Sequence, residues 1–382
     1  MSLNIKDSTF TIVANGFADG PSQALRDYLN SHKAKRVITV SHPLVPEGDN
    51  HHIIIEYSKG KLVNKKSIKL PNKPPYTYAF DSFVPLKLPK DDVWFGFNNL
   101  ACQRGLLRRK MGRSKKVVYW AVDFFPDRFG QSPATKVYNF FDSIVCRKSD
   151  SRVELTQTAL EKRPEYLGLS KDKLSPNLVI PMGAWLKRTP KTTEKSWAKK
   201  KVVYLGHLVD RQGVKTFIDA MHLLKEDGVE LRADVIGAGP LEEDLKKQAE
   251  KIGLKKIVTF HGFVKSHEKV ESILADATIA VAPYQKDPNN FTQFSDSGKL
   301  KAYMGASLPI VMTDVPPNAK ELVDAGVVEI AKDSAKDFAR VIDSFLKNNK
   351  KWSNARKASA KKAQEFDWDF ILKTKLKEIG IE

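Results

Sequence analysis

The 382-residue chain is 41% hydrophobic and 29% charged, a balance typical of an ordered globular protein, and its length favours two domains over a single core. Two cysteines are too few for a disulfide framework or a zinc site; with no apolar run of about 18 residues and no signal-peptide core, we expect a cytoplasmic protein that does not span a membrane. The formal net charge of +19 predicts an anionic partner, whether nucleic acid, a membrane surface or a phosphorylated substrate.

The first half of the chain alternates short apolar runs with amphipathic segments. Phe10–Ala14 predicts a strand, a turn at Asn15 and Gly16 follows it, and a helix begins near Pro21. Strand, glycine-containing turn and helix form the opening unit of a doubly wound α/β sheet, which binds ligands beyond the carboxyl ends of its strands. Further strands are expected at Val37–Val40, His52–Tyr57, Asp91–Phe97, Lys116–Val122, Ser143–Cys146 and Leu178–Met182.

A strongly basic segment, Gln103–Lys116, carries seven basic residues and no acidic one. Leucines and a methionine recur between the basic residues at helical spacing, which is typical of a helix that lies on an anionic bilayer surface. The alternative is a surface helix of a globular domain that packs its leucines inward, and the sequence favours neither. The residues expected to contact a membrane are Arg104, Arg108, Arg109, Lys110 and Arg113.

Asp123 directly follows the apolar strand Lys116–Val122. A carboxylate at the end of such a strand is well placed in a cleft, where it can act as a general base. The alternative is a helix N-cap, because aspartate is also common at that position. We favour the catalytic role.

The composition changes at Lys187–Lys201, which is polar and basic and predicts a linker between domains. A second set of alternating elements follows this segment. Strands are expected at Val202–Leu205, Ala233–Ile236, Ile257–Phe260, Ala277–Ala282 and Pro309–Met312, and helices at Gly213–Leu224, Leu241–Ile252, Glu268–Leu274 and Lys299–Ala306. We therefore predict an α/β protein with two Rossmann-like domains that face a central cleft.

The start of the helix at Lys299 predicts an anion site. Ser297, Gly298 and Lys299 bring together free backbone N–H groups, the positive end of the helix dipole and an ammonium group. This combination suits a phosphate or a diphosphate. The alternative is a solvated loop before an ordinary surface helix, since Ser and Asp are common N-caps.

The order of short motifs from Leu205 to Pro309 resembles the donor-binding half of GT-B glycosyltransferases, especially the large family-4-like group. The motifs are LGHL, VIGAGP, VTFHGF, ADATIAVAPY and KLKAYMGASLPIV. The segment Phe366–Asp369 resembles the C-terminal helix that returns to the first domain in this fold. The resemblance implies an acceptor-binding domain (1–185), a basic linker (186–201), a nucleotide-sugar-binding domain (202–365) and a returning helix (366–382).

The chain departs from the family-4 pattern at two places. His207 and Gln212 occupy positions where that group has basic residues for the diphosphate, with Arg211 as a substitute. Phe294 and Ala302 replace the paired glutamates of its retaining members.

A closer likeness is to the inverting, membrane-associated glucuronosyltransferase of xanthan assembly. The shared residues are Tyr119 and Asp123 in VYWAVD, the APY sequence that ends at Tyr284, and SDSGKL at 295–300. The resemblance implies that Asp123 is the general base and that Lys299 contacts donor phosphate. A glutamate that this enzyme uses near the donor falls on Phe263, so its sugar preference is not transferred.

The resemblance as a whole implies a metal-independent and inverting glycosyltransferase at the inner face of the membrane. It would move a sugar from a UDP- or GDP-sugar to a hydroxyl group of a glycan or lipid-linked acceptor, with no further cofactor and no nucleic-acid partner. Asn15 and Gly16 would lie on the acceptor side. The expected donor-binding residues are Gly206, His207, Arg211, Gly237, Gly239, Phe263, Tyr284, Ser297, Gly298 and Lys299. The alternatives are a retaining family-4-like enzyme and a non-catalytic binder of polyanions on the same scaffold.

Two pairs of metal-binding residue types do not predict a metal site. Asp367 and Asp369 form a DxD pair, but residues two apart on a helix point to different faces. His51 and His52 have no carboxylate or cysteine at ligand spacing and are expected to begin a strand.

Overall fold

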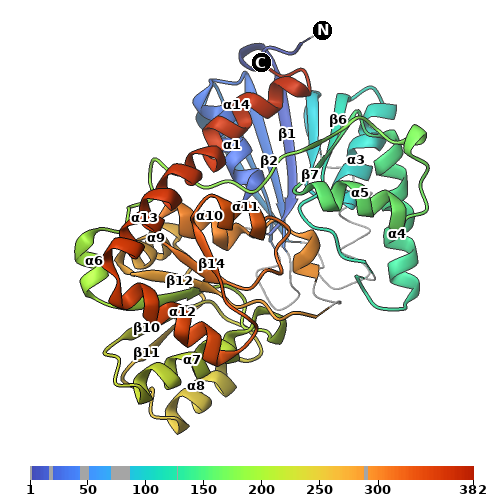
Figure 1. The fold of residues 1–382 in the computed structure, drawn as a ribbon. Coiled ribbons are helices and arrows are strands. Elements are labelled where there is room, and N and C mark those ends of the chain that lie inside the picture. Colours follow the sequence, from blue (N-terminus) through green and yellow to red (C-terminus); the bar gives the residue numbers. More distant parts are fainter. Residues whose placement is uncertain (1, 17–19, 44–50, 70–86, 127, 288–290) are drawn as a thin grey trace. The chain divides into compact units, whose positions relative to one another are not determined.

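The computed structural model describes residues 2–16, 20–43, 51–69, 87–126, 128–287 and 291–382. The chain divides into two compact units, which are residues 1–181 together with Asp369–Glu382, and Met182–Trp368. Each unit is an α/β layer structure built on its own sheet (Figure 1). In the described ranges no helix is both long enough and apolar enough to cross a bilayer.

The first unit is built on a sheet with the strand order β4-β3-β2-β1-β5-β6-β7-β8. The antiparallel pairs are β2 with β3 and β3 with β4, and the other neighbours are parallel. The strands are β1 (Thr9–Asn15), β2 (Arg36–His42), β3 (His51–Ser58), β4 (Lys61–Lys69), β5 (Asp91–Gly96), β6 (Ser114–Trp120), β7 (Ser151–Glu154) and β8 (Asn177–Val179). The helices are α1 (Pro21–Ser31), α3 (Asn99–Lys110), α4 (Pro133–Lys148), α5 (Gln157–Tyr166) and α14 (Trp368–Glu378), with 3-10 turns at Ile5–Asp7 and Lys171–Lys173.

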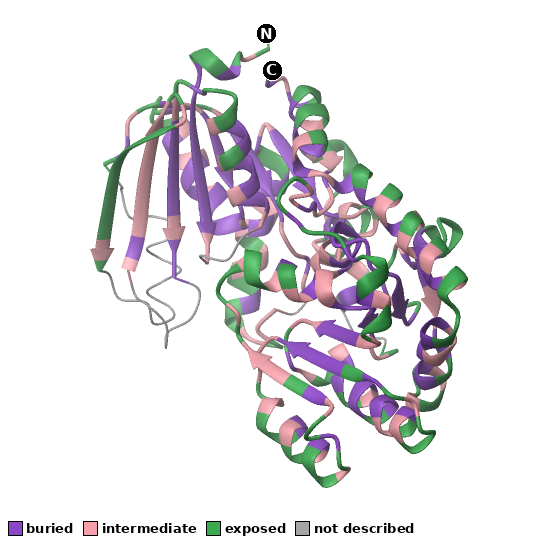
Figure 2. Ribbon diagram, turned by 90° about the vertical axis from the view of Figure 1, so that its left-hand side faces the viewer, coloured by how far each residue is buried: buried purple, intermediate pink, exposed green. Residues whose placement is uncertain are grey.

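Most of the strands predicted for this unit are confirmed, with three differences, one of which is that the short buried strand β7 was not predicted. The segment Ser143–Cys146, expected to be a strand, lies inside α4, which is capped by the Ser132 side chain and has Pro133 in its first turn. The edge strand β4 was not predicted, because its residues are almost all exposed and lack an apolar face. In Figure 2 this outermost strand is green while the central strands are purple.

The order of the strands creates a switch point between β1 and β5. From β1 the chain continues to β2 on one side, and it later enters the sheet at β5 on the other side of β1. The loops after these two strands therefore run in opposite directions, which leaves a crevice at the carboxyl edge of a sheet of this kind.

The second unit is built on a wholly parallel sheet with the order β11-β10-β9-β12-β13-β14. Its switch point lies between β9 and β12. The strands are β9 (Lys201–Leu205), β10 (Arg232–Ile236), β11 (Val258–Gly262), β12 (Ile279–Ala282), β13 (Ile310–Met312) and β14 (Val328–Ile330). The helices are α6 (Glu194–Ala198), α7 (Val214–Glu226), α8 (Glu242–Lys251), α9 (His267–Asp276), α10 (Gly298–Gly305), α11 (Ala319–Asp324), α12 (Ala335–Lys347) and α13 (Asn349–Ala363), with 3-10 turns η3 (Asp210–Gln212), η4 (Phe291–Phe294) and η5 (Gln364–Phe366).

Helical periodicity explains how α7 and α12 cover this sheet. The α7 positions Phe217, Met221 and Leu224 follow one another at intervals of four and three residues, and all are buried in the core of the second unit. On α12, Phe338 and Ile342 repeat the pattern and join the same core.

The segment expected to be a linker, Lys187–Lys201, is instead part of the second unit. It contains α6, and its residue Thr192 is fully buried, with the hydroxyl group donating to the carbonyl of Ala277 at 2.8 Å. Polar side chains of this segment make hydrogen bonds within the second unit, so the segment does not run free between two domains.

The predicted return of the C-terminal helix to the first unit is confirmed. Beyond α14 the chain pairs with the beginning of the same unit, since the Leu3 N–H donates to Gly380 at 2.8 Å and the Glu382 N–H donates to Leu3 at 2.8 Å. The Lys116 ammonium group on β6 donates to the carbonyl of Ile379. Asp369–Glu382 is therefore an integral part of the first unit.

Candidate functional site

The switch point of the second unit brings together five residues from distant parts of the sequence. Gly206 follows β9, and Gln212 ends the short turn η3 beyond it. Tyr284 follows β12, and Ser297 and Lys299 lie at the start of α10. Four of these five were predicted to bind the donor, whereas Gln212 was not.

The ammonium group of Lys299 is held at the centre of this cluster. It donates a hydrogen bond to Oε1 of Gln212 at 2.6 Å and lies 4.4 Å from the ring centre of Tyr204 and 4.9 Å from that of Tyr284. A Cβ atom on Gly206 would come within 2.6 Å of the ammonium nitrogen, so only glycine leaves room for it there. Burial lowers the pKa of Lys299 to about 7.

Three buried tyrosines, Tyr204, Tyr284 and Tyr303, form the walls of the cluster. Tyr303 accepts a hydrogen bond from the Leu205 N–H at 2.7 Å and donates to the carbonyl of Val281 at 3.0 Å, which links the ends of β9 and β12. The hydroxyl of Tyr204 donates to the carbonyl of His207 at 3.0 Å. Tyr204 and Tyr303 were not predicted, because a tyrosine in an apolar run looks like an ordinary core residue.

The Ser297 side chain contacts the Tyr284 hydroxyl at 2.5 Å and does not cap α10 by a hydrogen bond. The adjacent Asp296, which belongs to the SDSGKL motif, has a structural role. Its carboxylate pairs with Lys301 at 2.5 Å, accepts from the Met182 N–H at 2.7 Å and is almost completely buried. This ion pair anchors the loop that leads into α10.

The glycines after β10 pack against the loop that follows β9. Gly237 has φ of +132°, and a Cβ atom there would lie 2.0 Å from the Gly206 carbonyl oxygen. A Cβ atom on Gly239 would lie 2.5 Å from the carbonyl oxygen of Leu208. Both glycines are therefore required for the close approach of two loops at the carboxyl edge.

Three further predicted residues, His207, Arg211 and Phe263, lie near this edge in sequence, and no hydrogen bond between described side chains joins His207 or Phe263 to the Lys299 cluster. His207 is exposed, and partial desolvation together with the charge of Arg211 lowers its pKa. Burial lowers the pKa of Arg211. Phe263 follows β11 and is 69% exposed, which is unusual for a phenylalanine.

In the first unit, Asp123 lies in the loop after β6 and its side chain is 37% exposed. The carboxylate pairs with Arg128, whose guanidinium stacks on Phe125 at 5.0 Å and on Tyr138 at 5.1 Å. Asp123 does not cap a helix, because α4 begins ten residues later with Ser132 as its cap. The N-cap interpretation is therefore wrong.

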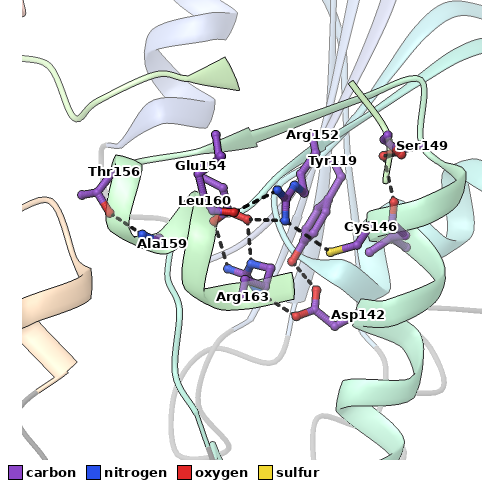
Figure 3. Close-up of polar contacts among 12 residues, drawn as sticks. Tyr119, Asp142, Cys146, Ser149, Arg152, Glu154, Thr156, Ala159, Leu160 and Arg163 are labelled. Carbon is purple, nitrogen blue, oxygen red and sulfur yellow. Dashed lines mark hydrogen bonds and ion pairs between the residues drawn. The ribbon is translucent and has the colours of Figure 1, made fainter. Parts of the chain in front are cut away.

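A buried ionic network is centred on Arg163 (Figure 3), which also contacts the backbone of the Asp123 loop. Arg163 of α5 donates to the carbonyl of Asp123 at 2.5 Å, and its guanidinium pairs with Asp142 at 2.7 Å and Glu154 at 2.7 Å. The Tyr119 hydroxyl donates to Asp142 at 2.6 Å. Since Tyr119 is only 1% exposed, it supports the loop from within rather than facing a ligand.

Asn15 ends β1 and Gly16 follows it at the switch point of the first unit. The Asn15 side chain accepts a hydrogen bond from Asn98, which follows β5, at 2.7 Å. Gly16 has φ of +95°, and its N–H donates to the carbonyl of His42 at 2.7 Å. Because β1, β5 and β6 are parallel neighbours, Asn15, Asn98 and Asp123 share one edge of the sheet.

The membrane prediction is wrong for Arg104 and Arg108. Both side chains are about 95% buried, and Arg108 pairs with the buried Asp91 at 3.1 Å. Arg109 is partly exposed and pairs with Asp150. Only Lys110 and Arg113 of the predicted set are exposed cations.

One member of the predicted histidine pair contacts a histidine of the neighbouring strand β2. His52 is buried and its Nδ1 lies 2.6 Å from Nδ1 of His42. Within the described ranges no three His, Cys, Asp or Glu side chains are grouped to hold a metal ion.

A comparison with protein families matches residues 187–365 to the model described as glycosyl transferases group 1. Among curated proteins the chain is similar to WcaL of Escherichia coli (strain K12), a candidate colanic acid biosynthesis glycosyltransferase, with 27% identity over 164 residues, 43% of this chain and 39% of WcaL. It is also similar to the GDP-mannose-dependent alpha-(1-6)-phosphatidylinositol dimannoside mannosyltransferase of Mycobacterium tuberculosis (strain ATCC 25177 / H37Ra), with 27% identity over 151 residues, 37% of this chain and 35% of that enzyme. The chain thus matches less than two fifths of the length of either relative.

Solved structures resemble the chain over almost its whole length. Sucrose-phosphate synthase from Thermosynechococcus elongatus has a TM-score of 0.69 at 14% identity and covers 97% of this chain and 98% of its own. WaaG, a glycosyltransferase involved in lipopolysaccharide biosynthesis, has a TM-score of 0.66 at 15% identity, covering 97% and 99%. Anabaena HepE in complex with UDP has a TM-score of 0.63 at 15% identity, covering 98% and 99%. The fold is therefore GT-B, and the part of the chain that matches the group 1 glycosyl transferase model lies almost wholly in the second unit.

Proposed function

We propose that this chain, whose residues 187–365 carry a group 1 glycosyl transferase domain on the GT-B fold, transfers a sugar from a nucleoside-diphosphate donor to a hydroxyl group of an acceptor. The observation that carries the proposal is the Lys299 ammonium group at the switch point of the second sheet. Among the described residues no carboxylate pairs with this ammonium group, whose one hydrogen bond goes to the neutral amide of Gln212. Burial without a nearby negative charge lowers its pKa. A partly buried cation that lacks a counter-ion favours an anionic ligand.

A diphosphate fits the chemistry around Lys299. The ammonium group can bind phosphate oxygens, and the first N–H groups of α10 supply further donors together with the positive end of the helix dipole. We propose that Gly206, His207, Arg211, Tyr284, Ser297 and Gly298 complete the diphosphate and sugar contacts.

The base and ribose would lie against the glycine turn at Gly237 and Gly239 and beside Phe263. The exposed ring of Phe263 offers a face on which a nucleobase can stack. UDP- and GDP-sugars are the expected donors, because UDP is bound in the structure of HepE and the similar mannosyltransferase is named as dependent on GDP-mannose.

Asp123 is the proposed general base, and Asn15 and Gly16 would lie on the acceptor side. The acceptor oxygen would attack the anomeric carbon opposite the leaving group and form the new C–O bond. The bond from that carbon to the diphosphate oxygen would break with its electron pair, and the hydroxyl proton would pass to the Asp123 carboxylate. This reaction inverts the anomeric centre.

Arg128 would hold the Asp123 carboxylate in position through their ion pair. Lys299 and the N-terminus of α10 would stabilise the charge that develops on the departing diphosphate. These fixed positive groups can do what a metal ion does in metal-dependent transferases, so we propose that the reaction needs neither a metal nor a further cofactor.

We also propose that the acceptor is a glycan or a lipid-linked saccharide and that the chain works at the inner, cytoplasmic face of a membrane. The supporting surface differs from the one predicted from sequence. We call it the α3–α4 face, and it consists of the exposed residues Lys110, Val137, Phe140, Arg147 and Lys148. Phe140 is 61% and Val137 is 56% exposed.

The charge of the α3–α4 face suits an anionic bilayer. Neither helix carries an exposed carboxylate, because α3 has no acidic residue and Asp142, the one acidic residue of α4, is 3% exposed. Exposed apolar side chains flanked by cations are typical of a surface that inserts at the headgroup level. The other side of α4 reaches the Asp123 loop, since Tyr138 contacts Arg128.

A panel of nucleotide sugars tests the proposed function. UDP- or GDP-sugars should raise the melting temperature, and release of the nucleotide should follow when an acceptor is added. Heparin and DNA serve as controls for non-specific polyanion binding. A chain stabilised by heparin or DNA but by no nucleotide would be a binding protein on the GT-B scaffold, and the enzymatic proposal would be wrong.

A further inference from the structure

Gln212 joins two segments that are distant in the sequence. It is the last residue of η3, whereas Lys299 lies 87 residues later in the first turn of α10. Its amide oxygen accepts the hydrogen bond from the Lys299 ammonium group at 2.6 Å. The two residues therefore connect the loops that follow β9 and β12, the two strands of the switch point.

The backbone on both sides of Gln212 is fixed against the segment after β12. Before it, the Arg211 carbonyl accepts a hydrogen bond from the Gln285 N–H at 3.1 Å. After it, Gly213 has φ of +68°, and a Cβ atom there would lie 1.6 Å from the Pro283 carbonyl oxygen. Only glycine permits this approach. The Gln212 side chain thus starts from a backbone that has little freedom to move away from Lys299.

The contacts of the ammonium group explain why a neutral acceptor matters. The hydroxyls of Tyr204 and Tyr284 are engaged with the His207 carbonyl and with Ser297, and their rings offer only their faces to the cation. Among the described residues, the Gln212 amide oxygen is the one hydrogen-bond acceptor that Lys299 has. An amide fixes the direction of the ammonium group without cancelling its charge, whereas a carboxylate would compete with a phosphate ligand.

We propose that Gln212 is a positioning residue of the diphosphate site, whose neutral amide holds the Lys299 ammonium group at the carboxyl end of β9 and leaves its charge available to the donor. This inference rests on the proposed function, since it assigns a role within the same site. It also explains how this chain can bind a diphosphate although Gln212 stands where the family-4-like group has a basic residue, because Lys299 then serves as the central cation.

A double-mutant cycle measured by calorimetry with UDP and GDP as probes tests this role. Gln212→Met keeps the length of the side chain and removes the acceptor, and it should weaken binding of the preferred nucleotide about tenfold. Lys299→Met should weaken it by about tenfold to a hundredfold. In the Lys299→Met background, Gln212→Met should change affinity by less than about twofold, because nothing remains to be positioned.

Two further variants sharpen the test. Gln212→Glu should weaken nucleotide binding more than Gln212→Met, because the carboxylate would neutralise the ammonium group. Gln248→Met is a matched control in the same unit, since the Gln248 side chain donates to the exposed Asp219 at 2.6 Å and does not contact Lys299. It should leave affinity unchanged, and circular dichroism should show that all variants are folded.

The pH dependence of binding separates positioning from a purely structural role. Nucleotide affinity should fall as the pH rises above about 7, because the Lys299 ammonium group of the nucleotide-free chain then loses its proton. Gln212→Met should move this fall to lower pH and Gln212→Glu to higher pH. A structural role would reduce affinity equally at every pH.

Additive effects in the cycle, or an unshifted pH profile, would overturn the role of Gln212 while leaving the nucleotide site intact. Failure of the unmodified chain to bind either nucleotide would overturn the proposed function and this inference with it.

Discussion

Replacing Asp123 by asparagine separates its proposed catalytic role from a structural one. The asparagine keeps the size of the side chain but cannot accept a proton, so turnover should fall by about 10²–10⁴-fold. The cost in stability should be small. The ion pair with Arg128 joins side chains that are 37% and 26% exposed, and pairs this accessible to water contribute about 1 kcal/mol or less. Arg128 also keeps its contacts with Phe125 and Tyr138 in the variant.

The assay compares three quantities on the same preparation: the melting temperature, the affinity for UDP or GDP, and the rate of nucleotide release in the presence of acceptor. Asp150→Asn is a matched control, since Asp150 belongs to the same unit, is also 37% exposed and pairs with Arg109. Only Asp123→Asn should lose turnover, while both keep their affinity for nucleotide. A variant at Asp123 that turns over normally would remove this residue from the mechanism and, with it, most of the case for inversion.

Three other perturbations test separate features of the first unit. Arg163→Met leaves the buried Asp142 without its cation and takes from the buried Glu154 one of its two arginine partners, the other being Arg152. It should lower the free energy of unfolding in urea by about 3–5 kcal/mol, whereas Arg147→Met at an exposed position should change it by no more than about 0.5 kcal/mol. Reversing the three cations of the α3–α4 face to glutamate should release the chain from vesicles that contain anionic lipid, since each contributes roughly 1 kcal/mol near such a surface. Reversal of three exposed lysines of α13, Lys350, Lys357 and Lys361, is the charge-matched control, and equal loss of binding in both variants would contradict a specific surface. Burial and the nearby Arg104 lower the pKa of His42 and of His52 below 6.5, so on acidification the unfolded chain binds protons at a higher pH than the folded chain does. The free energy of unfolding should therefore be highest above pH 6.5 and should decrease as the pH is lowered from there. In His42→Asn this decrease should be smaller.

Much of the fold could be predicted because each element carries its own periodic signal. The strands of the second sheet are short apolar runs, and the helices between them repeat apolar residues every three or four positions. Ser143–Cys146 shows the limit of such signals. Its β-branched residues favour a strand locally, but they continue a helical series that begins at Pro133 and packs α4 onto α3.

The basic segment was misread because the partners of its arginines lie elsewhere in the sequence. Arg108 pairs with Asp91, which precedes it by 17 residues, and its guanidinium stacks on Trp94 at 5.2 Å. At Gly105 the helix comes so close to Trp94 that a Cβ atom would lie 2.3 Å from the indole ring. A window confined to α3 contains the cations but neither the carboxylate nor the ring, so burial could not be predicted from it.

The sequence predicted which residues lie at the strand ends of the candidate site, but it did not predict which of them contact one another. Lys299 follows from its position at a helix start, because the chemistry of a helix N-terminus is local. Gln212 could not be found in this way, since its partner is 87 residues away and a glutamine has no intrinsic preference for such a place. Arg163 was missed for the same reason, because a buried arginine is identified only by the carboxylates that surround it.

The pairing of Leu3 with Gly380 and Glu382 has a consequence for the order in which the chain can fold during synthesis. The segment Asp369–Glu382 leaves the ribosome after every residue of the second unit, although it belongs to the first. The second unit can therefore complete its sheet while the first still lacks the helix and backbone hydrogen bonds that close it. A fragment cut at residue 181 would contain all eight strands of the first sheet but would leave β6 and the beginning of the chain without the segment that covers them.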